Sequence, residues 1–547
     1  MLNNQPATPA RSLNPWLVLA VICIPVFVGS LDLTVVSAFL PELIIDLELP
    51  LQTALDDAAW ILSGYLLAYT ISLTFMGRVS DLIGRRRVYV ACLLIFILGS
   101  VMVAVADQAP TSILYSIYRR FGQRPDIAFV NLQALILGRI VQALGAGALV
   151  PVSLALVGDL FPAAKRARPL GLVAAVDTLG WVLGHLYGGL MVQYVHWHWL
   201  FWINVPLTLF TIALVLWALR HVPQQRVQGR FDYLGTALII GALVCLNIGL
   251  GANIDISSSA SGFEDVAQIP AYFAPMMVLV VLFLAGFILV ESRVRDPLIN
   301  LGMFKRRNIS AGALVNLFVG FCLVIGLVSV PILINVRQES TQDLTAAALQ
   351  VGLLLSTLTI PMALAAIPGG WLSDRIGYRW TTVLGLGTAL TGFLLVWQTW
   401  TFEVSETVIA LEMVIIGVGL GLTFSPISTA VINSAKDAER GVASALVIIL
   451  RLIGMIISVS SLTTIALQRV NTLAAQAVGG TAVDPSQAVD TYARITVQVL
   501  GEMGLVGAVM CGLALIPALL LRREDDTGEA EPQPANVIDQ RQPVLVD

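Results

Sequence analysis

Four ionisable residues of this sequence lie inside long apolar stretches. They are two acids and two bases, namely Asp32, Asp177, Arg139 and Arg451. A charge in such a stretch costs several kcal/mol unless it is paired or faces water. A carboxyl group in a medium of low dielectric constant favours its protonated form, whereas an arginine beside it favours the charged form. A movement that separates acid from base can therefore load or release a proton, and we predict a proton-coupling or substrate-handling role for these four residues.

The composition indicates that these residues belong to a membrane protein. Of the 547 residues, 57% are hydrophobic and only 12% are charged, and the mean hydropathy is +0.85. Such values are far from those of soluble domains. The apolar runs have the length, about 20 residues, with which an α-helix crosses the hydrocarbon of a bilayer. We predict an all-α integral membrane protein surrounded by lipid, and the net charge of -4 argues against a nucleic-acid partner.

Fourteen membrane-spanning helices are predicted. They cover residues 16–41, 58–76, 88–106, 132–157, 169–191, 200–219, 232–252, 273–292, 309–335, 345–367, 381–399, 407–431, 442–466 and 495–521. Because the number is even, both termini lie on one side of the membrane. Most of the 31 Lys and Arg residues face the cytoplasm when the N-terminus is inside. Excess positive charge marks the cytoplasmic side, so we expect both termini to be cytoplasmic.

An internal repeat divides the chain into two related halves. One predicted loop reads GRVSDLIGRRR (77–87), and a later one reads GWLSDRIGYR (370–379). The shared residues are Gly77, Asp81, Gly84 and Arg86 in the first copy, and Gly370, Asp374, Gly377 and Arg379 in the second. Glycines permit tight turns, aspartates accept hydrogen bonds from a helix N-terminus or an arginine, and basic residues such as Arg85 anchor a loop at the anionic inner leaflet. We predict that both loops gate a conformational change; the alternative is that they only set the topology.

Together these patterns resemble the major facilitator superfamily. The segment LGRIVQALGAGALVP (137–151) resembles its fourth-helix motif through Arg139 and Gln142. The segments LDLTVVSAFLP (31–41) and WLFWINVPL (199–207) resemble the first-helix and sixth-helix motifs of its fourteen-helix drug:proton antiporters. The resemblance implies a 6 + 2 + 6 arrangement. Its parts are a cytoplasmic N-tail (1–15), a six-helix half (16–219), a linker with two extra helices (220–308), a second six-helix half (309–521) and a disordered cytoplasmic C-tail (522–547).

The fifth predicted span resembles the antiporter motif of that family. Gly180, Gly184 and Gly188 match its glycines, and His185 stands where the motif usually has a proline. Glycines four residues apart line one face of a helix and let another backbone approach closely. We therefore predict a packing role for these glycines.

Two further segments look closest to the actinobacterial exporters of triacylglycerides and glycolipids within the fourteen-helix group. They are AAVDTLGWVLGHLYGG (174–189) and VIILRLIGM (447–455). The resemblance implies lipid export across a bacterial inner (plasma) membrane. It also implies an acid at Asp177, a base at Arg451, and a lipid-carrying extracytoplasmic lipoprotein as a partner.

Two predicted outward loops have distinctive sequences. PTSILYSIYRRFG, within 107–131, places apolar residues one, three or four apart, which predicts a short amphipathic helix on the outer leaflet. It is either a contact for a lipid or partner, or a packed cap. The other loop, VHWHWLFW, carries His196 and His198 among tryptophans that suit the membrane interface.

We predict a secondary active transporter that works by alternating access, and not an enzyme. Lys165, Lys305 and Lys436 are the only lysines and none follows a glycine, so the chain lacks the usual phosphate-binding loop of an ATP-driven pump. The 4 histidines form no H-E-x-x-H pattern, and the 5 cysteines are scattered singly, so no metal site is predicted. We expect a monomer driven by a proton gradient, without a cofactor.

Two classes of substrate are consistent with the sequence. The favoured class is amphipathic lipids of the triacylglyceride or glycolipid type, because Arg139 and Arg451 balance Asp32 and Asp177 one for one. The alternative is a multidrug:proton antiporter that exports hydrophobic cations, whose site would keep carboxylates free of arginine partners.

Overall fold

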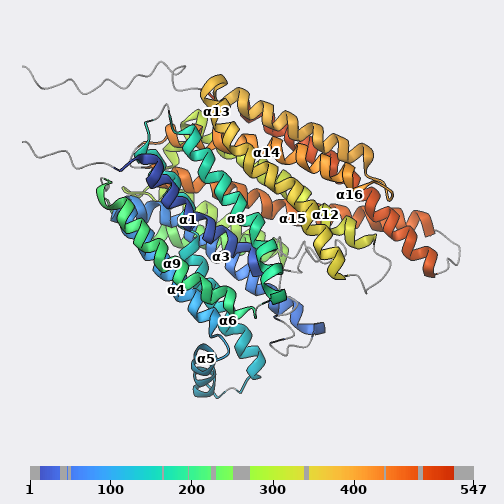
Figure 1. The fold of residues 1–547 in the computed structure, drawn as a ribbon, viewed down its shortest axis with the longest axis horizontal. Coiled ribbons are helices and arrows are strands. Elements are labelled where there is room, and N and C mark those ends of the chain that lie inside the picture. Colours follow the sequence, from blue (N-terminus) through green and yellow to red (C-terminus); the bar gives the residue numbers. More distant parts are fainter. Residues whose placement is uncertain are drawn as a thin grey trace, which may run out of the picture.

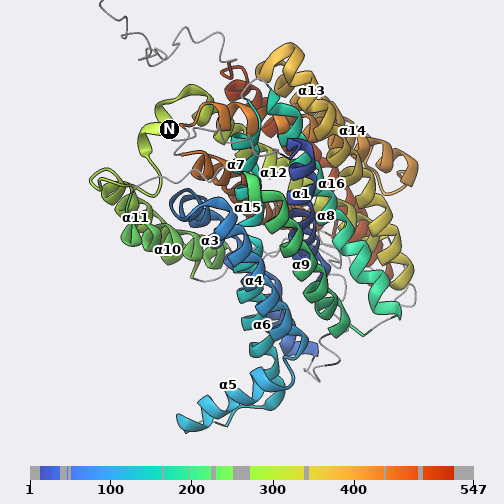
Figure 2. The same ribbon diagram turned by 60° about the vertical axis from the view of Figure 1, so that its left-hand side comes forward.

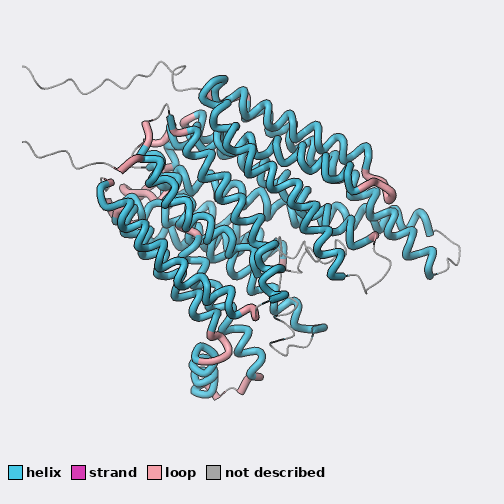
Figure 3. Tube along the Cα trace, viewed as in Figure 1, coloured by secondary structure: helices cyan, strands magenta, loops and turns pink. Residues whose placement is uncertain are grey.

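The structure is a computed structural model of the chain. It describes residues 13–36, 43, 46, 51–122, 124–162, 165–194, 196–222, 229–250, 272–337, 344–436, 439–478 and 485–522. Within these ranges every regular element is a helix (Figure 3). The predicted N-tail and C-tail lie almost wholly outside the described residues.

Long helices dominate the chain. In order they are α1 (Pro15–Val35), α3 (Leu51–Ile83), α4 (Arg85–Ala104), α5 (Ala109–Arg120), α6 (Ile127–Ala146), α7 (Leu149–Leu160), α8 (Ala167–Tyr194), α9 (His198–Ala218), α10 (Tyr233–Leu250), α11 (Phe273–Glu291), α12 (Arg307–Val336), α13 (Leu344–Thr399), α14 (Glu406–Asn433), α15 (Arg440–Val478) and α16 (Pro485–Ala518). Short 3₁₀ turns, η3 (Leu219–His221) and η6 (Leu301–Lys305), lie between them.

The helices agree with the predicted spans. Twelve stretches of the described residues are long and apolar enough to cross a membrane. One of these, Gln350–Thr399, holds two helices joined across a kink at Gly377. The helix α8 covers the predicted fifth span, 169–191. The prediction of an all-α membrane fold is therefore confirmed, with a helix for each of the predicted spans.

The boundaries of the repeated loops differ from the prediction. The stretch 77–83 is the end of α3, and α4 begins at Arg85, so the turn occupies a single residue. That residue is Gly84, with φ of 106°, and its counterpart Gly377 has φ of 84°. A glycine adopts this conformation without the steric cost that other residues meet, so the chain can reverse direction in one step. The polar residues of these helix ends made them look like loops.

The helices form two parts, each with an apolar core. The larger core is built mainly by α12 to α16 and the other mainly by α1, α3, α4 and α6 to α9, with a few residues of α14 and α15 packed into it. The pair α10 and α11 pack on each other beside α3 (Figure 2). Large apolar side chains on α11 are exposed, such as Val281 at 65% and Leu282 at 60%. An exposed apolar surface of this kind marks contact with lipid or with another protein, and on a membrane-spanning helix lipid is the expected cover.

The predicted amphipathic helix of 107–131 is present as α5. It projects from the end of the bundle (Figures 1 and 2). Leu114 packs against a small apolar core, whereas Ile113, Ile117 and Phe121 are exposed. An apolar hollow of about 450 Å³ lies between α3, α5 and α6 on this surface.

Candidate transport site

The first buried ion pair joins Asp32 of α1 to Arg139 of α6. The Arg139 Nη1 donates to Asp32 Oδ2 at 2.7 Å, and its Nη2 donates to the Asp32 carbonyl oxygen at 3.1 Å. The Asp32 Oδ1 accepts from the side-chain amides of Gln142 and Asn204, each at 2.9 Å. The Arg139 guanidinium also lies 3.9 Å from the centre of the Tyr65 ring. Both carboxylate oxygens are thus satisfied.

This pair is closed to water in the observed state. Asp32 is 1% exposed, and Arg139 and Gln142 are 0% exposed. A buried pair is tolerated when additional hydrogen bonds complete its coordination, as the Gln142 and Asn204 amides do for the Asp32 carboxylate. All its helices belong to the N-terminal part, so the pair also ties that part together.

The second ion pair joins Asp177 of α8 to Arg451 of α15 and crosses between the two parts. The Arg451 Nη2 lies 3.4 Å from Asp177 Oδ2, at the long end of hydrogen-bond range. Both side chains are 17% exposed. The Ser30 hydroxyl donates to Asp177 Oδ1 at 2.5 Å, and the Arg451 guanidinium lies 4.8 Å from the centre of the Phe424 ring. Its nitrogen–oxygen distance is longer, and its side chains are more exposed, than those of the Asp32–Arg139 pair.

Glycines of α8 bring Asp177 against α1. A Cβ at Gly180 would lie 2.7 Å from the Phe27 carbonyl oxygen, and a Cβ at Gly184 would overlap the Leu31 carbonyl oxygen and the Thr34 hydroxyl. The two backbones therefore touch, as the glycine spacing predicts. Gly188 is buried as well. The side chain of His185 lies outside the described residues.

The first repeated loop contacts the start of α15. A Cβ at Gly77 would overlap the carbonyl oxygen of Gly441, and a Cβ at Gly441 would lie 2.6 Å from Asp81 Oδ2. Asp81 therefore lies at the N-terminus of a helix, where the backbone dipole favours a negative charge. Arg85 lies 3.3 Å from Asp81 and 2.9 Å from Asp159, and Asp159 also pairs with Arg440 at 3.5 Å.

The second repeated loop makes the related contact in the other direction. A Cβ at Gly370 would lie 2.7 Å from the carbonyl oxygen of Ala167, the first residue of α8. Asp374 pairs with Arg168 at 3.1 Å. After the turn at Gly377, the Arg379 guanidinium lies 5.1 Å from the centre of the Trp380 ring. Each loop thus reaches the first turn of a helix in the opposite part.

These loop contacts define one end of the bundle, which we call the repeat end (Gly84 and Gly377 with the starts of α8 and α15). Further bonds join the parts there, from the Ser444 hydroxyl to the Pro151 carbonyl and from the Ser425 hydroxyl to the Ala167 carbonyl. Beyond it the two parts diverge, with α5 at the bottom of Figure 1 and the far ends of α15 and α16 at the right.

The sequence predicted all four members of the Asp32–Arg139 and Asp177–Arg451 pairs. It predicted neither Asp159, which binds Arg85 and Arg440, nor the neighbours Asn204 and Ser30. Asp159 had a signal, since it is an acid at the end of the apolar run 132–157 that arginines in other segments could approach. Asn204 and Ser30 had none, because uncharged polar residues are common in helices and only the packing shows what they contact.

Comparison with known proteins agrees with this architecture. The chain matches the Major Facilitator Superfamily over residues 22–459 and 317–543. A protein of Mycolicibacterium smegmatis named as a triacylglyceride transporter is 30% identical over 530 residues, which cover 93% of this chain and 88% of that protein. One of Mycobacterium tuberculosis with the same name is 30% identical over 531 residues, covering 93% of this chain and 95% of that protein.

Solved structures show the same fold at lower identity. A proton:xylose symporter has a TM-score of 0.55 and 14% identity, and the match covers 90% of this chain and 94% of that one. A human organic anion transporter has a TM-score of 0.55 and 14% identity, covering 93% of this chain and 100% of that one. The predictions of family and fold, and of a transporter rather than an enzyme, are confirmed. The chain is a multi-pass membrane transporter of the major facilitator superfamily.

Proposed function

We propose that this transporter exports triacylglyceride-like lipids and that entering protons drive the export. The observation that carries the proposal is the ion pair between Asp177 and Arg451. A relative movement of the two parts would separate this acid from its base, and the pair lies within the predicted spans, whereas the Asp159–Arg440 pair between the parts lies at the repeat end. The names of the mycobacterial relatives support the lipid substrate.

The proposed coupling follows from the environment of Asp177. In the observed state Arg451 lies 3.4 Å from the carboxylate and both side chains are 17% exposed, so water from the side opposite the repeat end can bring a proton to Asp177. Protonation removes the attraction between the carboxylate and Arg451, and α15 then moves away from α8 as the repeat end opens. The proton leaves on the side of the repeat end, and the charged carboxylate draws Arg451 back as the parts return. A carboxylate and an arginine on opposite parts thus link proton movement to the conformational change.

Asp32 is the second proposed coupling residue, and its surroundings restrict proton access more than those of Asp177 do. Its oxygens accept from Arg139, Gln142 and Asn204, and it is 1% exposed. A proton reaches it only when this network opens. We therefore place the first exchange at Asp177, and Asp32 behind it.

We assign the repeat end to the cytoplasm and the chain to a bacterial inner membrane. Basic residues such as Arg85, Arg86 and Arg379 gather at this end, which the positive-inside rule favours. In this assignment the observed state is closed on the cytoplasmic side, and both termini are cytoplasmic.

The experiment that tests the function uses purified protein in liposomes with an imposed proton gradient. Movement of a fluorescent acylglycerol is compared with that of a cationic dye, for the wild type and for Asp177→Asn. The matched control is Glu502→Gln, which also neutralises an acid, but one whose partner Arg469 lies within the same part at 2.8 Å.

We expect acylglycerol movement that depends on the gradient, is lost in Asp177→Asn and is retained in Glu502→Gln. Dye movement without acylglycerol movement would make the protein a multidrug antiporter and reject the lipid substrate. Full gradient dependence in a folded Asp177→Asn protein would reject the role of Asp177.

A further inference from the structure

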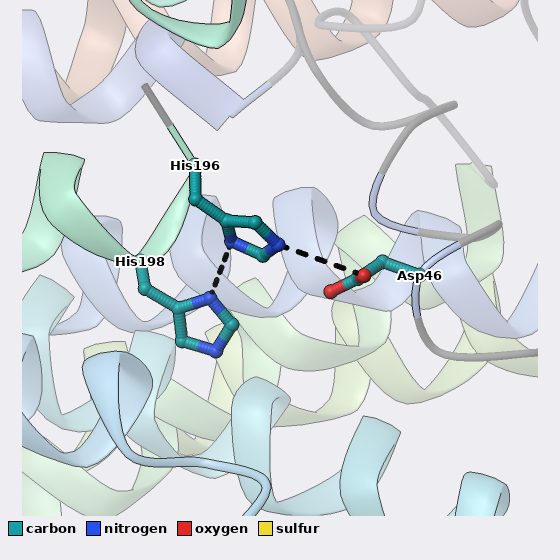
Figure 4. Close-up of side chains that lie close together, drawn as sticks. All are labelled: Asp46, His196 and His198. Carbon is teal, nitrogen blue, oxygen red and sulfur yellow. Dashed lines mark hydrogen bonds and ion pairs between the residues drawn. The ribbon is translucent and has the colours of Figure 1, made fainter.

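Two connections at the end opposite the repeat end bring together an acid and two histidines. Asp46 lies between α1 and α3, and His196 and His198 lie at the junction of α8 and α9 (Figure 4). One ligand atom from each of the three residues lies within 4.8 Å of the others. Asp46 and His196 are exposed and His198 is partly exposed, so an ion from solution can reach them.

The two imidazole rings approach each other through their Nδ1 atoms. The Nδ1 atoms of His196 and His198 are 2.8 Å apart, and His196 Nε2 lies 3.7 Å from Asp46 Oδ1 (Figure 4). Two imidazoles and a carboxylate are ligands that zinc accepts, at about 2.0–2.2 Å. Ligand atoms around a tetrahedral ion with such bonds are about 3.3 Å apart. Only one nitrogen of His196 can bind the ion, and the 2.8 Å and 3.7 Å distances involve different nitrogens of that ring. One ligand atom from each residue lies within 4.8 Å of the others, and rotation of the exposed side chains can bring these three atoms to the required separation.

Groups behind the three ligands hold them in place. Trp197, which is 1% exposed, donates from Nε1 to Asp46 Oδ2 at 2.9 Å, so that the other oxygen faces His196. The Trp197 ring also stacks on His198, with ring centres 3.6 Å apart. On the far side of that ring, Asp107 lies 3.8 Å from His198 Nε2.

The position of Asp107 has a chemical consequence for His198. At 3.8 Å the Asp107 carboxylate is beyond hydrogen-bond distance of Nε2, but a small rotation would let the Nε2–H group donate to it, which leaves Nδ1 with the lone pair that a metal requires. Ligating histidines commonly have such a carboxylate partner on their other nitrogen. A hydrogen-bonded pair of surface histidines would need neither the buried tryptophan nor the second acid.

We propose that Asp46, His196 and His198 form a binding site for a divalent transition metal ion of the zinc class, with Asp107 and Trp197 orienting the ligands. Three protein ligands leave the fourth tetrahedral position open to water or another donor. The ion would link the connection after α1 to the connection before α9. The prediction from sequence that the chain offers no metal site is replaced by this proposal, which does not depend on the transported substrate.

The test measures zinc binding to the full chain in detergent, expressed without a histidine tag and stripped with a chelator. Titration calorimetry gives the stoichiometry and Kd for the wild type, His196→Asn, His198→Asn and Asp46→Asn. His221→Asn, in η3, is the matched control because it removes a histidine outside the cluster. Cobalt(II) provides a second probe, since its visible absorption reports a tetrahedral site with nitrogen and oxygen ligands.

We expect one zinc ion per chain and a tetrahedral cobalt spectrum, both unchanged in His221→Asn. Loss of a group that bonds to a metal ligand typically costs about 10- to 100-fold in metal affinity. Asp107→Asn should therefore weaken zinc binding about tenfold, and each ligand variant should weaken it by at least about tenfold. Zinc should also raise the melting temperature of the wild type and not of a folded His196→Asn protein. Absence of saturable binding to the wild type, or unchanged binding in both histidine variants, would overturn the proposal.

Discussion

At the scale of single residues, two ion pairs of the same chemistry differ in how completely they are enclosed. Asp32 and Arg139 are fully buried, and every oxygen of the carboxylate has a donor. Asp177 and Arg451 are each 17% exposed and lie 3.4 Å apart. Removal of one member of a buried pair leaves an uncompensated charge, so the loss of one partner should cost more stability at the enclosed pair, and the open pair is freer to exchange protons.

Arg139→Gln should destabilise the protein strongly, whereas the double variant Asp32→Asn/Arg139→Gln should recover much of the loss. The single change leaves a buried carboxylate without its positive partner, at a cost of about 3–5 kcal/mol, but the double change leaves two neutral amides that can bond to each other. Thermal unfolding of purified protein in detergent measures both. Arg469→Gln serves as the control, because its partner Glu502 is at the surface, and we expect little change there. A double variant no more stable than Arg139→Gln would show that the network, and not the charge, needs Arg139.

At the scale of helices, contact between backbones positions the site. Ser30 reaches Asp177 because α8 lies directly on α1, and that approach depends on Gly180 and Gly184. The Thr34 hydroxyl donates to the Trp181 carbonyl oxygen at 2.7 Å, which is a further bond across the same surface. A side chain at either glycine would separate the helices and remove the serine from the carboxylate.

Gly184→Ala should lower the melting temperature and the rate of gradient-driven transport together. Its Cβ would overlap the Leu31 carbonyl oxygen, and overpacking of this kind costs about 1–3 kcal/mol. Gly352→Ala is the matched control, since nothing lies within 4 Å of an added Cβ on that exposed residue of α13. Alanine there should stabilise the helix by up to about 1 kcal/mol. An equal response of the two variants in thermal unfolding would contradict close packing of α1 on α8.

The positions of the helices along the chain were predictable from sequence, but the residues that contact each other between helices were not. A span is a local property, because about 20 apolar residues cross the bilayer whatever surrounds them. The one-residue turns at Gly84 and Gly377 also had a local signal in the repeated glycines. Asp46 meets His196 across 150 residues of sequence, and the length and composition of a segment carry no information about such a contact.

At the scale of the whole molecule, the two parts contact each other through two related pairs of helices at the repeat end. Helix α3 meets α15, and α8 meets α13. Each contact uses a glycine against a backbone carbonyl, with a few polar side-chain bonds around it, so the surfaces can separate as units. Alternating access requires such surfaces, because the parts must rock while each part stays intact.

A reversible cross-link at the repeat end should therefore stop transport without unfolding either part. Arg168 and Asp374 are 3.1 Å apart, on opposite parts, with 55% and 24% of their side chains exposed. In a chain whose five native cysteines are replaced by alanine, Arg168→Cys/Asp374→Cys should react with a short bifunctional thiol reagent. Gradient-driven acylglycerol movement should then fall to the background level and return when the link is reduced.

The control cross-link joins Arg469→Cys to Glu502→Cys, which lie as close together but within one part, on α15 and α16. Transport should continue there, because rocking does not change that distance. If both cross-links stopped transport equally, the movement would have to involve bending inside the C-terminal part, and the rigid rocking of two parts would be wrong. If neither did, transport would not require the repeat end to open, and the proposed role of the duplicated loops as gates would be lost.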